Sequence, residues 1–196
     1  MTTQHIETLI IGAGQAGLST GYHLKQLDRE CLIVDGLDRI GDNWRRHYDS
    51  LRLFTPSRAN SLDGTPFPGD PWAFPTKDEF ASYLELYAVE HDLPVRMRTR
   101  VDRLVRREGG GFTATLGAED VTCVNVVVAT GTFGRTPQVP AFAGEIDPRI
   151  RQLHSSEYRR PSQLPDGPAL VVGGSHSGLD IAYELAETRS TTLVGP

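Results

Sequence analysis

The chain has 196 residues, of which 38% are hydrophobic and 23% charged, proportions that are ordinary for a globular protein with a sizeable core. Its net charge of -5 argues against a nucleic-acid or anionic-membrane partner, because phosphate contacts require clustered lysines and arginines. Every apolar run is shorter than the roughly 18 residues of a membrane span, and no signal peptide is evident, so we expect a cytoplasmic protein.

The chain opens with the pattern of a strand, a glycine-rich turn and a helix. A strand is expected over 7–11 and a helix over 15–27, with the turn Gly12-Ala13-Gly14-Gln15-Ala16-Gly17 between them. A second strand, over 31–34, ends at Asp35, 23 residues after Gly12. Such glycines allow a pyrophosphate to approach the helix N-terminus, and the carboxylate can accept hydrogen bonds from ribose hydroxyls. The pattern predicts a dinucleotide site; the alternative is a β-α-β unit whose glycines serve only packing.

Residues 36–75 are rich in proline, glycine and aromatic residues. A loop of this length is uncommon in a compact domain unless it is functional. A disordered segment would contain few aromatic residues. We therefore expect an ordered insertion that folds over a ligand; the alternative is a satellite hydrophobic cluster without a ligand.

A helix is expected to follow this insertion. Thr76 and Glu79 have the spacing of a capping box, which predicts a helix from this point to about residue 91. Its buried face is predicted from residues at helical spacing, namely Phe80, Tyr83, Leu84 and Tyr87.

Several short stretches between residues 95 and 131 have the character of strands, at 95–97, 101–105, 112–116, 121–123 and 124–129. The turn Gly109-Gly110-Gly111 predicts an antiparallel pair. The run at 124–129, apolar apart from Asn125, is typical of a strand buried on both faces, and it ends in Ala129-Thr130-Gly131. The proline-rich stretch that follows is expected to be a connection.

The opening motif recurs 161 positions later, where Leu170 to Leu179 align with Leu9 to Leu18. The second turn reads Gly173-Gly174-Ser175-His176-Ser177-Gly178, and a helix over 176–187 and a strand over 191–194 are expected after it. Ser175 replaces the middle glycine, and Pro196 stands where the offset places the counterpart of Asp35, which argues against NAD. The alternative is a nucleotide-binding fold that has lost its ligand.

Together these elements predict an α/β protein with two Rossmann-like dinucleotide-binding units, parallel sheets, a small antiparallel β-meander and an incomplete second unit. We expect a first domain over 1–140 with an insertion at 36–75, a connecting segment over 141–168, and the start of a second domain over 169–196. Two strands and one helix bury their faces poorly, so we expect the N-terminal portion of a longer protein, or a truncated one. Two dinucleotide sites in one chain indicate electron transfer between two cofactors.

The two cysteines bear on which class of redox enzyme the chain could belong to. Cys31 and Cys123 lie in apolar strand contexts and are expected to be buried free thiols. The chain contains no C-x-x-C pair, which disfavours disulfide reductases. We find no metal-ligand spacing in the sequence.

The motifs occur together in an order that resembles the single-chain flavin-dependent monooxygenases, which include the plant auxin-forming enzymes, and in particular their bacterial CzcO-like branch. The motifs that carry this resemblance are the first glycine turn, Ile40-Gly41-Asp42-Asn43-Trp44-Arg45, Ser50-Leu51-Arg52-Leu53-Phe54-Thr55-Pro56, Pro66-Phe67-Pro68, Val127 to Gly131, His154 to Arg159 and the second glycine turn. The resemblance covers essentially the whole chain.

The resemblance implies two cofactor sites, for FAD and for NADP. The FAD residues would be Gly12, Gly14, Gln15, Ala16 and Gly17 at the pyrophosphate, Asp35 at the ribose, Asn43, Trp44 and Arg45 along the flavin, Val101 at the adenine through its backbone, and Ala129, Thr130 and Gly131 where the chain leaves the domain. The NADPH residues would be Gly173, Ser175, His176, Ser177 and Gly178.

The activity that the resemblance implies is an NADPH-dependent monooxygenase working through a C4a-(hydro)peroxyflavin. The chemistry would belong largely to the cofactors and would need no catalytic triad. The substrate would be a small molecule that is apolar or carries a nucleophilic nitrogen or sulfur or a carbonyl group. The family's pattern F-x-G-x-x-x-H-x-x-x-Y/F is present as Phe142, Gly144, His154 and Tyr158, with six extra residues between glycine and histidine. His154 and Tyr158 could shape a cleft, or the histidine could be satisfied by its own loop. Two other functions remain open: an NAD(P)H oxidase or dehydrogenase that does not oxygenate, and a truncated or inactive flavin-binding module.

Overall fold

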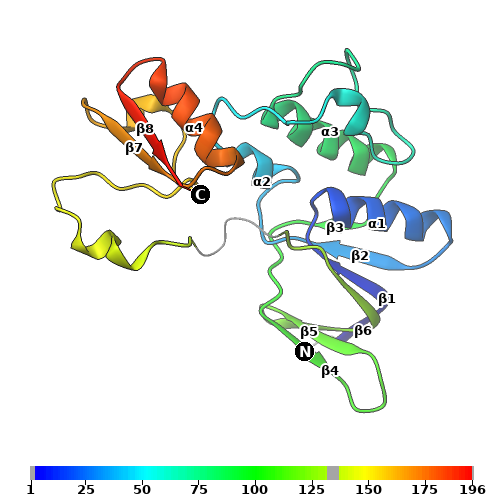
Figure 1. Ribbon diagram of the computed structural model, residues 1–196. Helices are drawn as coiled ribbons and strands as arrows, with labels where there is room; N and C mark the ends of the chain where they lie inside the picture. Colours follow the sequence, from blue (N-terminus) through cyan, green and yellow to red (C-terminus); the bar gives the residue numbers. More distant parts are fainter. Residues whose placement is uncertain (1–2, 132–136, 196) are drawn as a thin grey trace. The chain divides into compact units, whose positions relative to one another are not determined.

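The computed structural model describes residues 3–131 and 137–195, and contacts divide the chain into two compact units (Figure 1). The first unit combines Met1–Arg45 with Leu53–Thr132, and the second combines Arg46–Arg52 with Phe133–Pro196. Residues 46–52 lie within the predicted insertion, but they contact the second unit.

The first unit is built on a mixed sheet. Within the described residues this sheet has six strands in the order β3-β2-β1-β6-β5-β4, parallel from β3 to β6 and antiparallel from β6 to β4. The strands are β1 (Thr3–Ile11), β2 (Cys31–Val34), β3 (Val95–Arg96), β4 (Arg103–Arg106), β5 (Phe112–Leu116) and β6 (Glu119–Val128). The predicted α/β class with a parallel sheet and an antiparallel meander is confirmed.

Strand β6 corrects the prediction of separate strands at 121–123 and 124–129. It is continuous because its first residues pair with β5 while it also pairs with β1 along nearly its whole length. The same pairing extends β1 back to Thr3, four residues before the predicted start. Such long-range pairing cannot be read from local periodicity.

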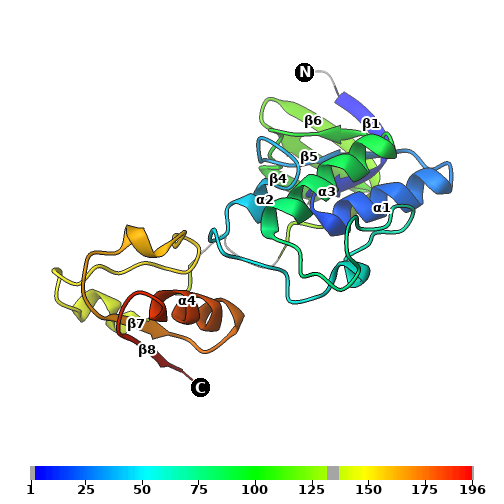
Figure 2. The same ribbon diagram turned by 90° about the horizontal axis from the view of Figure 1, so that it is seen from above.

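Helices α1 (Gln15–Gln26) and α3 (Lys77–Glu90) lie on the same face of this sheet (Figures 1 and 2). The capping box is present: the Thr76 hydroxyl accepts a hydrogen bond from the Glu79 amide at 3.2 Å, and Glu79 accepts one from the Thr76 amide at 2.7 Å. The predicted face of α3 is buried, with Phe80, Tyr83, Leu84 and Tyr87 all at most 5% exposed. Two short helices in the insertion, α2 (Asp42–Arg45) and η1 (Ser57–Ala59), were not predicted.

The first unit has cores on both faces of its sheet. On the helical face, Ile33 lies close against Gly21 of α1. A separate buried cluster joins the sheet to the meander, and it contains Ile6, Leu9, Val34, Ala114, Leu116, Val121 and Cys123. Burial on both faces applies to β1, in which Leu9 and Ile10 are both fully buried. The same expectation is wrong for 124–129, because Val124 and Val128 are 53% and 66% exposed.

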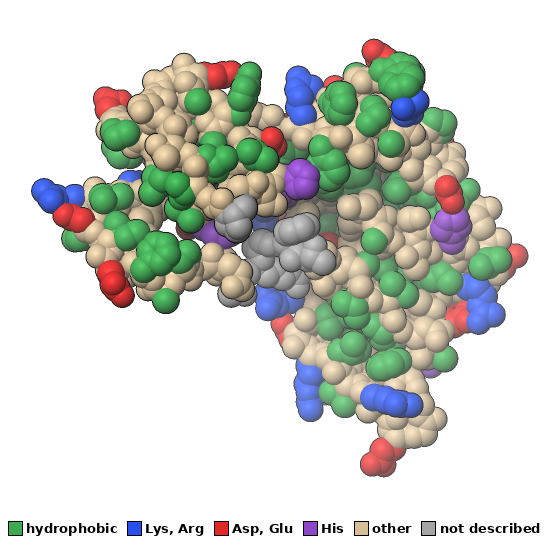
Figure 3. Space-filling model, viewed as in Figure 1, with side chains coloured by type: hydrophobic (Ala, Val, Ile, Leu, Met, Phe, Trp, Pro, Cys, Tyr) green, Lys and Arg blue, Asp and Glu red, His purple; other side chains and the backbone are tan. Residues whose placement is uncertain are grey.

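The second unit is smaller. Its described elements are η2 (Ala141–Glu145), η3 (Pro161–Gln163), β7 (Ala169–Val172), α4 (His176–Ala186) and β8 (Thr191–Val194), and β7 and β8 form a parallel pair. Ala169 and Val171 pack against a core of Tyr48, Tyr158, Ile181 and Leu185, whereas the alternate β7 residues Leu170 and Val172 are 64% and 58% exposed. Hydrophobic side chains are accordingly visible on the surface of this unit (Figure 3).

A search of the described residues finds no helix that combines the length and the apolar character needed to cross a membrane.

Candidate functional site

The first glycine turn has a backbone that only glycine adopts readily. Gly12 has a φ of +113°, and its amide donates to the Val34 carbonyl at 2.8 Å. A Cβ at this position would lie 2.3 Å from the Ala129 carbonyl oxygen. The structure therefore places Ala129 and Thr130, both predicted site residues, directly beside Gly12.

Gly17 is required by the packing of helix on strand. A Cβ there would lie 1.8 Å from the Gly12 carbonyl oxygen, closer than any side chain could fit. The turn is closed by the Leu18 amide, which donates to the Gly14 carbonyl at 2.9 Å. This is the close helix–strand contact expected of the third glycine in a dinucleotide-binding turn.

Gly14 is different, because nothing in the protein requires it to be glycine. Its backbone is extended, with φ -81° and ψ -175°, and a Cβ would meet no atom within 4 Å. The open space lies at the N-terminus of α1, a helix with no acidic residue in its first turn and no side-chain cap. A helix terminus with free amides and a positive dipole end suits a phosphate group. The geometry fits a pyrophosphate in this space.

Asp35 joins the end of β2 to the glycine turn. Its Oδ2 accepts a hydrogen bond from the Ala13 amide at 2.8 Å, and its Oδ1 accepts one from the Leu37 amide at 2.9 Å. Each carboxylate oxygen can accept a second hydrogen bond. The half-buried carboxylate is thus fixed in orientation and retains acceptor capacity for ribose hydroxyls.

A small pocket of about 20 Å³ brings several predicted residues together. It is lined by Ala13, Gly14, Asp35, Leu37, Arg39, Ile40, Gly41, Asn43, Trp44, Leu84 and Met97. The glycine turn, the carboxylate and α2 therefore share one site. A pocket of this size admits only a small part of a dinucleotide, so the rest of such a ligand would extend over the surface of the first unit.

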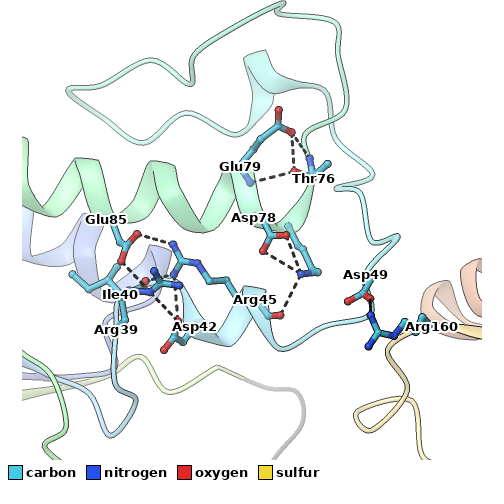
Figure 4. Close-up of polar contacts among 11 residues, drawn as sticks. Arg39, Ile40, Asp42, Arg45, Asp49, Thr76, Asp78, Glu79, Glu85 and Arg160 are labelled. Carbon is cyan, nitrogen blue, oxygen red and sulfur yellow. Dashed lines mark hydrogen bonds and ion pairs between the residues drawn. The ribbon is translucent and has the colours of Figure 1, made fainter. Parts of the chain in front are cut away.

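Helix α2 contributes Asn43 and Trp44 to the lining of this pocket, whereas Arg45, also predicted, is bonded to Ile40 and to α3 and does not line it. Trp44 Nε1 donates to Gln15 Oε1 at 3.4 Å, which links α2 to the first turn of α1. Arg45 donates to the Ile40 carbonyl at 2.7 Å and to Glu85 Oε2 at 2.6 Å (Figure 4). These bonds hold α2 against α3, and the Arg45 side chain is only 16% exposed.

The remaining predicted residues of the first unit lie around this site rather than in the pocket lining. Gln15 and Ala16 are exposed in the first turn of α1. Gly131 follows β6 with a φ of +73°. Val101 packs against the cluster beneath the meander.

The second glycine turn repeats the backbone of the first. Gly173 has a φ of +111°, and its amide donates to the Val194 carbonyl at 2.7 Å. A Cβ on Gly178 would again lie 1.8 Å from the carbonyl oxygen of the first glycine. Ser175 adopts φ -81° and ψ 179°, close to the backbone of Gly14. Gly173, Ser175, His176, Ser177 and Gly178 thus form one turn at the start of α4.

The surroundings of the two turns differ. A Cβ on Gly173 would meet nothing within 4 Å, because none of the described strands flanks β7 on the side away from β8. Ser175 has a side chain where the first turn, at Gly14, leaves open space. Pro196, the counterpart of Asp35, lies outside the described residues.

Sequence reasoning missed a polar network in the second unit. The buried Tyr48 hydroxyl donates to Asp180 Oδ2 at 2.8 Å, and the buried Tyr158 hydroxyl donates to Glu184 Oε2 at 2.6 Å. Burial, followed by the hydrogen bond to the carboxylate, raises the pKa of each phenol well above its usual range. Tyr48 and Asp180 are 132 residues apart, and no sequence signal pairs them.

His154 is satisfied by its own loop. Its Nδ1 lies 2.9 Å from Ser156 Oγ and accepts from the Ser156 amide at 3.2 Å. This agrees with the local alternative raised from the sequence. Tyr158, predicted with it, lies in the core of the second unit.

Both cysteines are free; Cys123 is buried and Cys31 half-buried, and burial raises the pKa of each thiol. Among the described residues, no group of three or more His, Cys, Asp or Glu side chains could hold a metal ion.

Comparison with known proteins identifies the family of this chain. The profile described as pyridine nucleotide-disulphide oxidoreductase matches residues 9–195. The chain belongs to this family. The chain is similar in structure to a flavin-containing monooxygenase from Stenotrophomonas maltophilia, with a TM-score of 0.87 at 29% identity, over 97% of this chain and 57% of that one.

Two relatives extend the comparison. The "Uncharacterized oxidoreductase CzcO-like" of Geobacillus kaustophilus is 47% identical over 191 residues, which cover 97% of this chain and 54% of the relative. The indole-3-pyruvate monooxygenase YUCCA1 of Oryza sativa is 32% identical over 186 residues, 90% of this chain and 44% of the relative. The resemblance to flavin monooxygenases and CzcO-like oxidoreductases is confirmed, and the chain spans about half the length of these relatives.

Proposed function

We propose that this chain forms the FAD site of an NADPH-dependent flavin monooxygenase and carries part of its NADPH site. The observation that carries the proposal is the open space at Gly14. Its backbone conformation and its surroundings would both accept a side chain, so the glycine is explained by a group that lies against it. The pyrophosphate of FAD is such a group, and the adjacent helix terminus suits its charge.

In this proposal the residues of the first unit hold and orient the flavin. Gly12, Gly14, Gln15, Ala16 and Gly17 receive the pyrophosphate, Asp35 receives the ribose, Asn43, Trp44 and Arg45 form the α2 side, and Val101, Ala129, Thr130 and Gly131 border the adenine and the domain exit. The FAD-binding domain predicted at 1–140 would then consist mainly of the first unit, without residues 46–52 and 133–140, which belong to the second unit.

The second turn, with Gly173, Ser175, His176, Ser177 and Gly178, would hold NADPH, and residues 169–196 would begin the domain predicted for it. Bound flavin supplies a hydride acceptor and, once reduced, a reaction with dioxygen. The protein's part is to position the two dinucleotides and exclude water. A small substrate with a nucleophilic nitrogen or sulfur, or a carbonyl group, fits the monooxygenase relatives.

The alternative raised from the sequence is a module that holds FAD without turnover. NADPH consumption in air separates this module from an enzyme, and peroxide release in place of an oxygenated product identifies an NAD(P)H oxidase.

The FAD site is tested by Gly14→Val, with Gly144→Val as the matched control. Both glycines lie outside the left-handed region, and at both a Cβ meets nothing within 4 Å. We expect both variants to fold, with a cost of about 1 kcal/mol or less at the helix N-cap. Only Gly14→Val should lose bound flavin, measured by absorbance after desalting. Retention of FAD by folded Gly14→Val would contradict the proposed site.

A further inference from the structure

Residues 46–52 leave the first unit, join the core of the second and return. The residues on either side are held in the first unit. Lys77 Nζ donates to the Arg45 carbonyl at 3.3 Å, and the Leu53 amide donates to the Pro75 carbonyl at 2.8 Å. The change of unit therefore occurs at 45/46 and again at 52/53.

Tyr48 fastens this segment to α4. Its side chain is 3% exposed and packs against Tyr158, with 6.4 Å between ring centroids. Its hydroxyl donates to Asp180 at 2.8 Å and lies close to the Ser177 side chain. Ser177 lies in the second glycine turn, so one buried phenol contacts both that turn and the helix it opens.

The backbone adds a second attachment. The Asp49 amide donates to the Arg159 carbonyl at 2.8 Å. The Asp49–Arg160 ion pair, at 3.6 Å, is exposed and contributes little (Figure 4). Tyr48, the backbone hydrogen bond of Asp49 and the packing of Leu51 against the same core all contribute to the attachment of this segment.

We propose that residues 46–52, termed the strap, couple the two dinucleotide sites, with Tyr48 as the positioning residue. Helix α2, which carries Asn43 and Trp44, ends at Arg45, three residues before Tyr48. Only residues 46 and 47 lie between α2 and Tyr48. In this proposal a shift of α2 when FAD binds reaches Tyr48, and through it Ser177, along this short covalent link. This coupling rests on the proposed function, because it requires FAD beside α2 and NADP at α4.

The second unit contains a matched control for Tyr48. Tyr158 is also 3% exposed and donates to Glu184, one helical turn further along α4, at 2.6 Å. It belongs to a different segment, and no hydrogen bond joins it to the second glycine turn in the described structure. Tyr158→Phe therefore removes a tyrosine–carboxylate hydrogen bond from the same core but leaves the hydrogen bond between Tyr48 of the strap and Asp180 in place.

The coupling is measured as the ratio of NADP⁺ dissociation constants with and without FAD, using the full chain. In the unmodified chain we expect FAD to change NADP⁺ affinity about 5-fold or more. The ratio should fall close to one in Tyr48→Phe and persist in Tyr158→Phe. A ratio that survives Tyr48→Phe, or an unmodified chain that binds both dinucleotides without coupling, would overturn the role of the strap.

A second readout needs no cofactor. Hydrogen exchange at the Asp49 amide should be about tenfold faster in Tyr48→Phe, because the loss of a buried hydrogen bond releases the segment. Tyr87→Phe, which removes a buried tyrosine hydrogen bond in the first unit, should leave this amide unchanged. Unchanged exchange in Tyr48→Phe would overturn the strap whatever the cofactors do. An unmodified chain that binds neither dinucleotide would instead contradict the proposed function.

Discussion

The two glycine turns share a backbone but not an environment. In both turns, a Cβ on the third glycine would lie 1.8 Å from the carbonyl oxygen of the first glycine. In the first turn, however, Leu18 is fully buried and Leu9 has no exposed surface. Their counterparts in the second turn, Leu179 and Leu170, are 52% and 64% exposed.

This difference separates what the local sequence determines from what the neighbours determine. The turn geometry follows from the glycines and the adjoining strand, so it forms in both units. Burial depends on flanking elements: β6, α3 and the meander cover the first unit, whereas α4 covers one face of the second. The same substitution should therefore have different effects in the two turns.

The largest expected difference is between Gly17→Ala and Gly178→Ala. Both introduce a methyl group 1.8 Å from a backbone oxygen. Since α1 is enclosed in a packed core, we expect Gly17→Ala to cost about 4 kcal/mol in the free energy of unfolding of the first unit. Helix α4 has more freedom to shift, so Gly178→Ala should cost about half as much. Hydrogen exchange across a denaturant series, followed separately in each unit, measures the free energy of unfolding of both variants. Equal losses of stability in the two variants would refute the difference in packing.

A second pair, Leu18→Ala and Leu179→Ala, compares burial directly. Removal of a fully buried leucine side chain costs about 2–5 kcal/mol, so Leu18→Ala should fall in this range. Leu179→Ala should change stability by about 0.5 kcal/mol or less, because half of its surface is already in solvent. Thermal unfolding provides the measurement. A large loss for Leu179→Ala would show that another segment covers it in solution.

A last expected difference concerns alkaline stability, and it develops only above pH 10. Tyr48 and Tyr158 have a pKa raised above the ordinary value of 10.0, so the unfolded chain loses these protons first. Their contribution is complete below pH 10 and declines above it, by about 1.4 kcal/mol per pH unit for each tyrosine. The double variant Tyr48→Phe/Tyr158→Phe should flatten this decline in the second unit, while the first unit keeps its own through Tyr83 and Tyr87. An unaltered slope in the second unit would contradict the assignment.

Much of the fold could be predicted because the signals are local. The strands β2, β5 and β8 have the predicted limits, and the Thr76–Glu79 capping box starts α3 as expected. The glycine turn, Asp35 and α2 residues also meet in one pocket as the motif implies.

What could not be predicted depends on residues far apart in the chain. Helix α2 is too short to give a periodic pattern, and Gly41 holds it where a Cβ would lie 2.6 Å from the Ala81 carbonyl oxygen. Tyr48 lies within the predicted insertion, and nothing in the sequence around it indicates its hydrogen bond to Asp180. The continuity of β6 depends on its pairing with both β1 and β5.

The central claim, that the first glycine turn holds FAD, is tested most directly by the visible absorption spectrum of the unmodified chain after incubation with FAD and desalting. The account predicts flavin bands corresponding to about one FAD per chain, with the folded first unit verified by circular dichroism. A folded chain that retains no flavin would contradict it.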